Sequence, residues 1–396
     1  MTNFVKACPV CSNTEFDVLV DFGQVPHSGA FISVSCESFK KIQLSFEYCL
    51  TCSMIRRCSF DKFCPDYRKA NRSTQNQMPE YIPEIIRYLS QTPKKEGGLV
   101  IDIGGNDGAF MDLLSKEGFQ NRLIIEPSEF LAGLSREKGH QVENVYFNSC
   151  EAERIRQEYG SAKVVFCRHV LEHVPDPEDF FHALRIMTDK EGLVFLEAPD
   201  ALGITQGLLG HELWDEHLYY YSENHLAMMA EKAGYNIQWK AKKPHRGGHN
   251  LLLWLKLGNK HSALSLKPEG NNLAFCHSFK DRWQAFSKRL YYQATKWPRP
   301  IALLGASHSQ SNYAIFTGIG NQIEFMVDDD PNKMNTFVPL PQAVPVISTD
   351  QLLNHNSIGT LLLTAFGCED WIESLRQPLS ERGTLLIDPY KFSEPA

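Results

Sequence analysis

The run from Val100 to Phe110, VIDIGGNDGAF, constrains the fold of this chain more than any other stretch. A short apolar strand breaks into a loop that contains Gly104, Gly105 and Gly108, and a helix follows. Glycines let the backbone turn sharply and approach a ligand at positions where a Cβ would clash. The run therefore predicts an α/β domain with a ligand site where the strand ends.

The spacing of this loop argues against a dinucleotide as the ligand. The pattern G-x-G-x-x-G fails because Asn106 occupies the second glycine position, and Asp107 would add negative charge beside a pyrophosphate. A cofactor without phosphates fits better, and we expect S-adenosylmethionine (SAM). Asp102 lies at the strand tip, and the next strand ends at Glu126, within range of a ribose-binding carboxylate. A Gly-rich turn without a ligand is the structural alternative.

Length and composition narrow the class of protein. At 396 residues the chain is too long for one ordinary core, so two or three domains are expected. No apolar run approaches the roughly 20 residues that cross a bilayer, and the first residues lack the layout of a signal peptide. A net charge of −7 argues against a dominant nucleic-acid surface. We expect a cytoplasmic protein that binds neither membranes nor nucleic acid.

Four of the 11 cysteines form two C-x-x-C pairs, Cys8 with Cys11 and Cys49 with Cys52. In a reducing compartment this pattern indicates a metal site in preference to disulfides. Four thiolates complete a tetrahedral zinc site and leave no position for water, so the zinc would be structural. A redox C-x-x-C is the alternative. The apolar content of this segment is small, which makes a metal useful to its stability.

The rest of the chain alternates strands and helices, a pattern that predicts βαβ units and a mainly parallel sheet. Seven expected strands suit a SAM methyltransferase core: Leu99–Ile103, Arg122–Glu126, Gln141–Tyr146, Lys163–Cys167, Leu193–Ala198, Asn236–Ala241 and Leu251–Lys256. A helix over Asn272–Trp297 follows, and its apolar stripe comprises Phe275, Phe279, Phe286 and Leu290. That stripe predicts a helix that connects two domains or forms a dimer.

We therefore expect an α/β protein built from a connector and three domains. A small zinc-binding β domain would span residues 1–68, with strands Phe16–Phe22 and Ile42–Tyr48. A central seven-stranded, Rossmann-like SAM methyltransferase domain would span 69–257, and the helical connector 258–297. A C-terminal Rossmann-like α/β domain would span 298–396, with strands Ile301–Leu304, Ile323–Val327, Thr360–Thr364 and Thr384–Ile387. The oligomeric state, monomer or homodimer, stays open.

Titratable side chains crowd into the block from His211 to Ser222, HELWDEHLYYYS. Such a density of groups is what the removal of a proton beside a carbonyl requires. Glu216 directly precedes His217, and because neighbours on a helix point apart, a contact between them would need a turn. Structural histidines and surface acids explain such clusters equally well.

The two C-x-x-C pairs, IGGNDG, IEPS and DEHLYYYS occur in this order along the chain. Together they resemble the sugar C-methyltransferases of deoxysugar biosynthesis, and the resemblance covers nearly the whole chain. Members of that family methylate C3 of a nucleotide-linked 4-keto-deoxysugar. The resemblance implies this activity, by attack of an enolate on the SAM methyl group. It also implies SAM and structural Zn²⁺ as cofactors and a nucleotide-diphosphate sugar as the small-molecule partner.

Roles for individual residues follow from matching them to the family's motifs. His217 would be the base that forms the enolate, with Glu216 beside it and His173 as a second pocket histidine; the segment LEHV around His173 also recurs in SAM methyltransferases of many substrates. The cofactor residues would be Asp102, Gly104, Asn106, Gly108, Glu126, Phe147, Asn148 and Arg168. The substrate residues would be Trp214, Tyr67, Tyr219, His249 and His308, and the zinc ligands Cys8, Cys11, Cys49 and Cys52.

Three positions depart from the family pattern. Trp214 and Lys69 stand where tyrosines are usual, and Ser309 replaces a lysine in the C-terminal unit, where His308 could compensate. An indole only donates a hydrogen bond and is bulkier than a phenol, so different sugar oxygens would be satisfied. Two further hypotheses stay open: a SAM-dependent methyltransferase that acts on oxygen, nitrogen or another activated ketone, and a non-catalytic zinc-ribbon protein that recognises nucleotides or partners.

Overall fold

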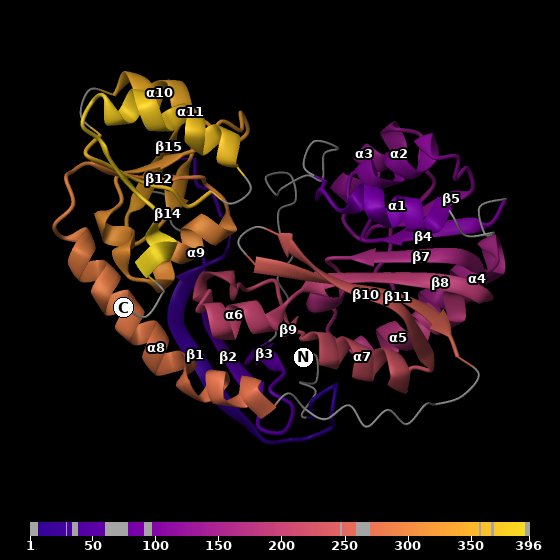
Figure 1. Cartoon of the computed structure of the whole chain (residues 1–396). Helices are drawn as coiled ribbons and strands as arrows, with labels where there is room; N and C mark the ends of the chain where they lie inside the picture. Colours follow the sequence, from indigo (N-terminus) through magenta and orange to yellow (C-terminus); the bar gives the residue numbers. More distant parts are fainter. Residues whose placement is uncertain are drawn as a thin grey trace.

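The computed structural model describes residues 7–28, 30–33, 39–59, 78–90, 97–245, 248–258, 270–355, 358–365 and 368–392. Over these residues the chain forms three sheets of four, seven and six strands (Figure 1). The seven-stranded sheet belongs to the central segment. The four-stranded sheet, called the N-terminal sheet below, takes three of its strands from the N-terminal segment. The six-stranded sheet belongs to the C-terminal unit.

The central sheet has the strand order β10-β11-β8-β7-β4-β5-β6. Its strands are β4 (Leu99–Ile103), β5 (Arg122–Ile125), β6 (Val142–Glu143), β7 (Ala162–Arg168), β8 (Thr188–Pro199), β10 (Tyr235–His245) and β11 (Gly248–Leu257). All pairs from β8 to β6 are parallel, and β11 is antiparallel to both of its neighbours. The parallel strands bring their carboxyl ends to one edge. The predicted α/β fold with a seven-stranded central sheet is confirmed.

Helices cover both faces of this sheet, as the continuous apolar runs of its strands require. Along β7, Val164 and Phe166 pack in the core with α1 (Ile82–Ser90) and α2 (Ala109–Lys116). The alternate residues, Val165 and Cys167, pack in a second core. That core includes α4 (Ser149–Tyr159), α5 (Pro177–Met187) and α7 (Glu223–Lys232), and a further helix, α3 (Glu129–Glu137), follows β5.

The N-terminal sheet consists of β1 (Phe16–Pro26), β2 (Lys41–Cys49), β3 (Ile55–Arg57) and β9 (Tyr219–Tyr220) in that order. The first three come from the predicted zinc-binding segment, but β9 comes from the central segment and pairs antiparallel with β3. The chain therefore crosses between the two sheets. The predicted domain boundaries at residues 68 and 257 stay predictions. The N-terminal sheet takes strands from both sides of residue 68.

The C-terminal sheet has the order β14-β15-β13-β12-β16-β17. Its strands are β12 (Ile301–Leu304), β13 (Phe325–Val327), β14 (Phe337–Pro339), β15 (Ala343–Ile347), β16 (Thr360–Leu362) and β17 (Leu385–Ile387), with helices α9 (His308–Phe316), α10 (Thr349–Asn354) and α11 (Glu369–Ser380). Four of the strands match the predicted ones in position. Strands β14 and β15 were not predicted, because Pro339 and Pro345 interrupt short apolar runs that read as loop.

Shorter elements connect these units. They are α6 (Ala201–Gly207) and the 3₁₀ turns η2 (Leu171–His173), η3 (Gly210–Glu212), η4 (Ile319–Gln322) and η5 (Pro389–Phe392). Helix α8 (Gly270–Ala294) runs along the N-terminal sheet toward the C-terminal unit (Figure 1). Of its predicted stripe, Phe279, Phe286 and Leu290 are buried in one core that both of these units share, whereas Phe275 is exposed. The stripe is thus covered within the chain.

Trp283 of α8 is the side chain to change in order to test this shared core. Its ring packs beside Phe279 and Phe286, and its Nε1 donates to the carbonyl of Phe316 at 3.3 Å. Trp283→Ala would leave a cavity, and we expect it to lower the free energy of unfolding by about 3–5 kcal/mol in denaturant titrations. Tyr292→Ala on the exposed side of the same helix should change it by less than about 0.5 kcal/mol. Equal losses for the two variants would contradict the packing described.

Candidate active site

The glycine loop after β4 has the backbone shape that its sequence predicts. Gly104 and Gly108 have φ angles of +71° and +79°. A Cβ on Gly104 would lie 2.4 Å from Cγ2 of Val170, and one on Gly108 would lie 2.6 Å from Cδ2 of His140. Asn106 also has a positive φ, +54°. The loop therefore lies close against its neighbours and opens at the carboxyl edge of the sheet.

Glu126, at the end of β5, binds this loop through main-chain hydrogen bonds. Its Oε2 accepts from the amide of Asn106 at 3.0 Å, and its Oε1 accepts from the amide of Ser128 at 2.8 Å. Burial raises the pKa of the carboxyl, although the two amides oppose that shift. Each carboxylate oxygen retains acceptor capacity. The arrangement is that of a fixed carboxylate that can bind a diol.

Asp102 and Arg168 lie next to each other at the ends of β4 and β7. Burial raises the pKa of Asp102 to about 7, although the Arg168 guanidinium opposes the shift. The Nε of Arg168 donates to Glu197 at 2.7 Å, and its guanidinium lies 4.6 Å above the ring of Phe110. Arg168 is therefore held by a buried carboxylate and an aromatic face. Its predicted role toward the cofactor rests on its place at the edge of the sheet.

Phe147 and Asn148, also predicted to contact the cofactor, follow β6. The ring of Phe147 packs edge-to-face against Phe180, with centroids 5.5 Å apart. Asn148 is the N-cap of α4, and its Oδ1 accepts from the amide of Glu151 at 2.9 Å. Both side chains have structural roles in this arrangement. They lie at the correct edge of the sheet, and their contact with a cofactor stays a prediction.

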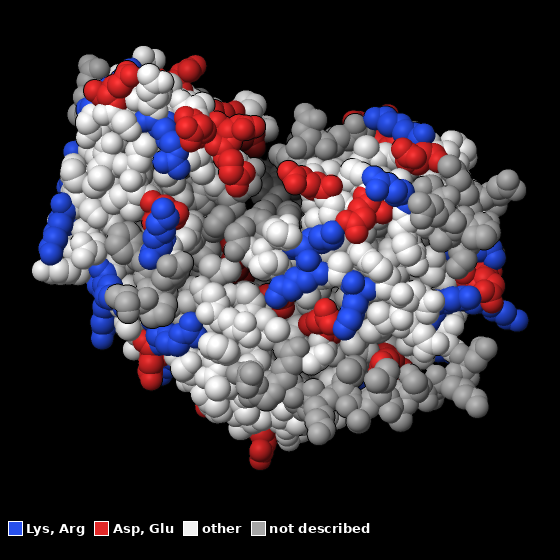
Figure 2. All heavy atoms as spheres, in the orientation of Figure 1, with Lys and Arg blue, Asp and Glu red and all other residues white. Residues whose placement is uncertain are grey.

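The second half of the site lies in the turn after η3. His217 is buried, and its ring centroid lies 4.5 Å from that of Trp214 and 4.8 Å from that of His173. Trp214 in turn stacks on His308 of α9, with centroids 3.9 Å apart and planes at 12°. The structure thus brings together four of the predicted residues from η2, the turn and the C-terminal unit. Figure 2 shows that the surface is hollowed between the central domain and the C-terminal unit.

Hydrogen bonds from the N-terminal segment hold this turn. The carboxylate of Asp215 accepts from Nδ1 of His27 at 2.7 Å and from the amide of Ser28 at 3.1 Å. Arg57 donates to the carbonyl of Asp215 at 2.7 Å. On the other side, the hydroxyl of Tyr220 accepts from the amide of Trp214 at 2.8 Å. These bonds flank His217 and fix the backbone that carries it.

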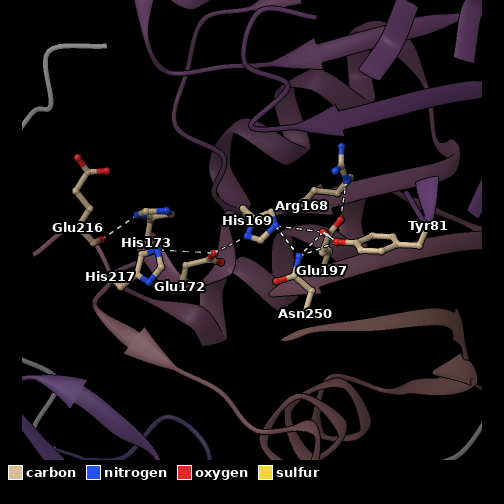
Figure 3. A network of polar contacts seen from close by, with 9 residues as sticks. All are labelled: Tyr81, Arg168, His169, Glu172, His173, Glu197, Glu216, His217 and Asn250. Atoms are coloured by element: carbon tan, nitrogen blue, oxygen red, sulfur yellow. Dashed lines mark hydrogen bonds and ion pairs between the residues drawn. The ribbon is translucent and has the colours of Figure 1, made fainter. Parts of the chain in front are cut away.

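Burial dominates the charge states in this turn. It lowers the pKa of His217 well below the usual value, and His173, His308 and His169 lower it further. Burial also raises the pKa of Glu216 to about 8, with help from the negative charge of Asp215. His217 is therefore neutral near pH 7, with a lone pair on one ring nitrogen. The side chain of Glu216 points away from His217 (Figure 3).

The remaining predicted substrate residues have different positions. Tyr219 is fully buried in β9, and its hydroxyl donates to the carbonyl of Pro175 at 3.4 Å, so it packs in the core. His249 is exposed in β11. Ser309, which replaces a lysine of the family pattern, donates to Glu212 at 2.7 Å. The predictions for Tyr67 and Lys69 lie outside the described residues.

Sequence reasoning missed a buried polar network beside the carboxyl edge of the central sheet (Figure 3). Glu197 of β8 is its centre: Oε1 accepts from Nδ2 of Asn250 at 2.8 Å, lies 3.1 Å from Nε2 of His169 and also accepts from the hydroxyl of Tyr81. Against the effect of burial, Arg168 and His169 hold the pKa of Glu197 well below its usual range. A lone glutamate inside the apolar strand LVFLEAP was the signal that could have found it.

The four cysteines of the two C-x-x-C pairs meet as predicted. The Sγ atoms of Cys8 and Cys52 are 3.6 Å apart, and those of Cys11 and Cys49 are 3.5 Å apart. All four lie within 4.8 Å of one another. Zinc–sulfur bonds of about 2.3 Å in a tetrahedron place the sulfurs about 3.8 Å apart. The donor set and its spacing are therefore compatible with zinc.

Comparisons with known proteins identify similarity to methyltransferases. Residues 74–238 match the family model described as a methyltransferase domain. The whole chain is 20% identical over 403 residues to the C-methyltransferase NovU of Streptomyces niveus, covering 97% of this chain and 95% of that protein. This chain is therefore similar to a C-methyltransferase along nearly its whole length and contains a methyltransferase domain. A methyltransferase domain is in keeping with the cofactor that the glycine loop predicts.

Other relatives match a shorter part of this chain. The ubiquinone biosynthesis O-methyltransferase of Pseudomonas aeruginosa is 30% identical over 118 residues, which cover 29% of this chain and 50% of that protein. Among solved structures, SAM-bound magnesium protoporphyrin IX methyltransferase from Synechocystis is 16% identical with a TM-score of 0.35, over 45% of this chain and 78% of that one. In the part of the chain that the structure describes, no helix is long and apolar enough to cross a membrane.

The raised pKa of Asp102 gives a prediction about stability. Because the folded state holds this proton up to about pH 7 and the unfolded chain loses it near its usual pKa of about 3.9, stability should fall as pH rises between these values. Asp102→Asn removes the titrating group. Denaturant titrations should therefore show the variant gaining on the wild type from about pH 4 to pH 7. A constant difference across this range would contradict the assignment.

Proposed function

We propose that this methyltransferase transfers the methyl group of SAM to C3 of a nucleotide-diphosphate-linked 4-keto-deoxysugar. The observation that carries the proposal is the position of His217. This neutral imidazole is buried in a turn, beside the stacked rings of Trp214 and His308. Similarity to a C-methyltransferase along nearly the whole chain supports a carbon acceptor. The partner would be a small molecule, with no nucleic acid or membrane involved.

His217 would act as the general base. A ketone at C4 makes the C3 proton acidic, and a neutral imidazole can accept that proton. The low pKa of His217 keeps it unprotonated at neutral pH. When the C3–H bond breaks, the electron pair forms an enolate and the proton moves to a ring nitrogen of His217. Such assistance supplies roughly 10²–10⁴-fold in rate.

SAM, when bound, supplies an electrophilic methyl group on a sulfonium. Glu126 and the backbone from Gly104 to Gly108 would hold it at the carboxyl edge of the sheet, with Asp102 facing its polar end. The enolate carbon would then form a bond to the methyl carbon as the sulfur–carbon bond breaks. Orientation of the two reactants supplies much of the remaining acceleration. The chain contributes position, and the zinc-type cysteine cluster takes no part in this step.

The Trp214–His308 stack would form one wall of the sugar site. Its two members come from the central segment and the C-terminal unit, so the wall forms only where these units meet. An indole in place of the family's tyrosine offers a broad face and one donor. Ser309, held by Glu212, cannot supply the positive charge of the lysine that it replaces. These two differences would set which nucleotide sugar is accepted.

Methylation of oxygen is the second candidate, and the similarity of part of this chain to ubiquinone biosynthesis O-methyltransferases favours it. Proton and carbon NMR of the product separates a methyl group on carbon from one on a heteroatom. Candidate acceptors would be screened first by thermal shift with SAM and thymidine-, guanosine- and cytidine-linked keto sugars, since bound ligand raises the melting temperature.

The base assignment is tested by deuterium exchange. Without methyl transfer, the wild type should exchange the C3 hydrogen of its keto sugar with solvent D₂O, as NMR would show. His217→Asn should lower exchange and methylation by roughly 10²-fold or more, because the proton acceptor is gone. His182→Asn, an exposed histidine on α5, is the matched control. Normal exchange in His217→Asn would remove His217 from this role.

We also propose that the four cysteines hold a structural zinc ion. Three of them are buried in the core that the N-terminal segment shares with the central domain, so the metal would stabilise that junction. Metal analysis of the purified wild type should give about one zinc per chain. Cys52→Ser should lose the metal and lower the melting temperature, whereas Cys150→Ser, an exposed cysteine, should do neither. Full zinc content in Cys52→Ser would refute the site.

A further inference from the structure

Glu172 is a buried acid in contact with the proposed base. It lies in η2 with 1% of its surface exposed, and neither carboxylate oxygen accepts a hydrogen bond from the described residues. Two ring nitrogens face Oε1: Nδ1 of His169 at 3.4 Å and Nε2 of His217 at 4.0 Å (Figure 3). A buried carboxylate is costly unless cations or donors face it. Here the facing groups are histidines.

The backbone fixes this pair of residues in place. The amide of Leu218 donates to the carbonyl of Glu172 at 2.7 Å, and Nδ1 of His173 donates to the carbonyl of Glu216 at 2.9 Å. These two bonds join η2 to the turn on both sides of His217. The main chains of Glu172 and Leu218 are thus joined directly, which places the side chains of Glu172 and His217 on adjacent segments.

His169 holds the carboxylate from the other side. Its backbone adopts a left-handed conformation, φ +52°, which is rare for a residue with a side chain. Its amide donates to the carbonyl of Glu197 at 2.9 Å, and its ring lies between Glu172 and Glu197. Against the effect of burial, the two carboxylates raise the pKa of His169 to about 9, so it is a cation near pH 7. Strain of this kind is found where function requires a particular geometry.

The two nitrogens of His217 have different surroundings. Nε2 faces Glu172, whereas Nδ1 is buried without a hydrogen-bond partner in the described part of the chain. We propose that Glu172 is the positioning residue of the base: from 4.0 Å, a small side-chain rotation brings its carboxylate within hydrogen-bond distance of Nε2–H of His217, which leaves the lone pair on Nδ1 to remove the substrate proton. This inference rests on the proposed function of His217.

Charge compensation is the second part of this role. When the C3–H bond breaks and the proton binds Nδ1, His217 becomes an imidazolium in a site that disfavours cations. The rings of His173, His308 and His169 also surround it, and Tyr220 packs against it. Among these groups Glu172 is the one that carries negative charge toward Nε2. It would hold the tautomer before proton transfer and stabilise the cation afterwards.

Glu172→Gln keeps the shape of the side chain and removes its charge. We expect the rate of C3 exchange and kcat to fall by roughly 100-fold or more, while KM for the sugar and Kd for SAM stay within about twofold. The matched control is Glu178→Gln, an exposed glutamate on α5. Exchange at the control's rate, or a loss explained by weaker binding alone, would overturn the proposal.

Nitrogen NMR of ¹⁵N-histidine protein gives a test that needs no active variant, with His217→Asn to assign the signal. The wild type should show His217 with its proton on Nε2, and Glu172→Gln should shift the tautomer toward Nδ1–H. A wild type with the proton on Nδ1 would overturn the proposal, even if Glu172→Gln fails to fold. If the wild type exchanges no C3 hydrogen, the proposed function fails, and the tautomer still decides the role of Glu172.

Glu172, His173 and His217 also have the donor atoms of a metal site, within 4.8 Å of one another. Metal analysis separates the two interpretations. Positioning by Glu172 predicts the same metal content in the wild type, Glu172→Gln and Glu178→Gln. An additional ion that only Glu172→Gln lacks would show that the three side chains bind a cation, and would overturn the proposal.

Discussion

The rest of the candidate site depends on the hydrogen bonds that hold Asp215. His27 and Ser28 bind its carboxylate, and Arg57 binds its carbonyl, so three positions of the N-terminal segment fix one residue of the central segment. His217 lies two residues further on, so these bonds fix the backbone that carries it. The N-terminal segment, which is remote in sequence from the glycine loop, thus fixes the backbone that carries the proposed base.

The site combines several buried titratable groups whose charges offset one another. Glu197 and Glu172 are each faced by His169, and Arg168 lies beside Glu197 and Asp102. Such a network is costly to bury and is stable only when nearly every member has a partner. The network runs from the carboxyl edge of the central sheet to the turn of His217, through Glu197, His169 and Glu172. Changes at one end are therefore expected to affect the other.

Much of the fold could be predicted from sequence because its signals are local. The apolar strands Leu99–Ile103 and Ile301–Leu304 match the structure residue for residue, and the four cysteines meet as their spacing predicts. Contacts between distant segments left weaker signals. Tyr219 matched a family motif beside the proposed base, yet strand geometry turns it into the core. The network around Glu197 was missed, because one acid in a buried strand shows no partner in the sequence.

The placement of β9 has a consequence for how the chain acquires its structure during synthesis. Strand β3 has its outer neighbour only when Tyr219 and Tyr220 arrive, long after β3 itself has been made. Until then the N-terminal sheet has three strands and an open edge, which other chains could join. Strands β1, β2 and β3 are thus made before the strand that completes their sheet. The four cysteines, within residues 8–52, are also made before β9, so the zinc ion proposed there would bind before the sheet has its last strand.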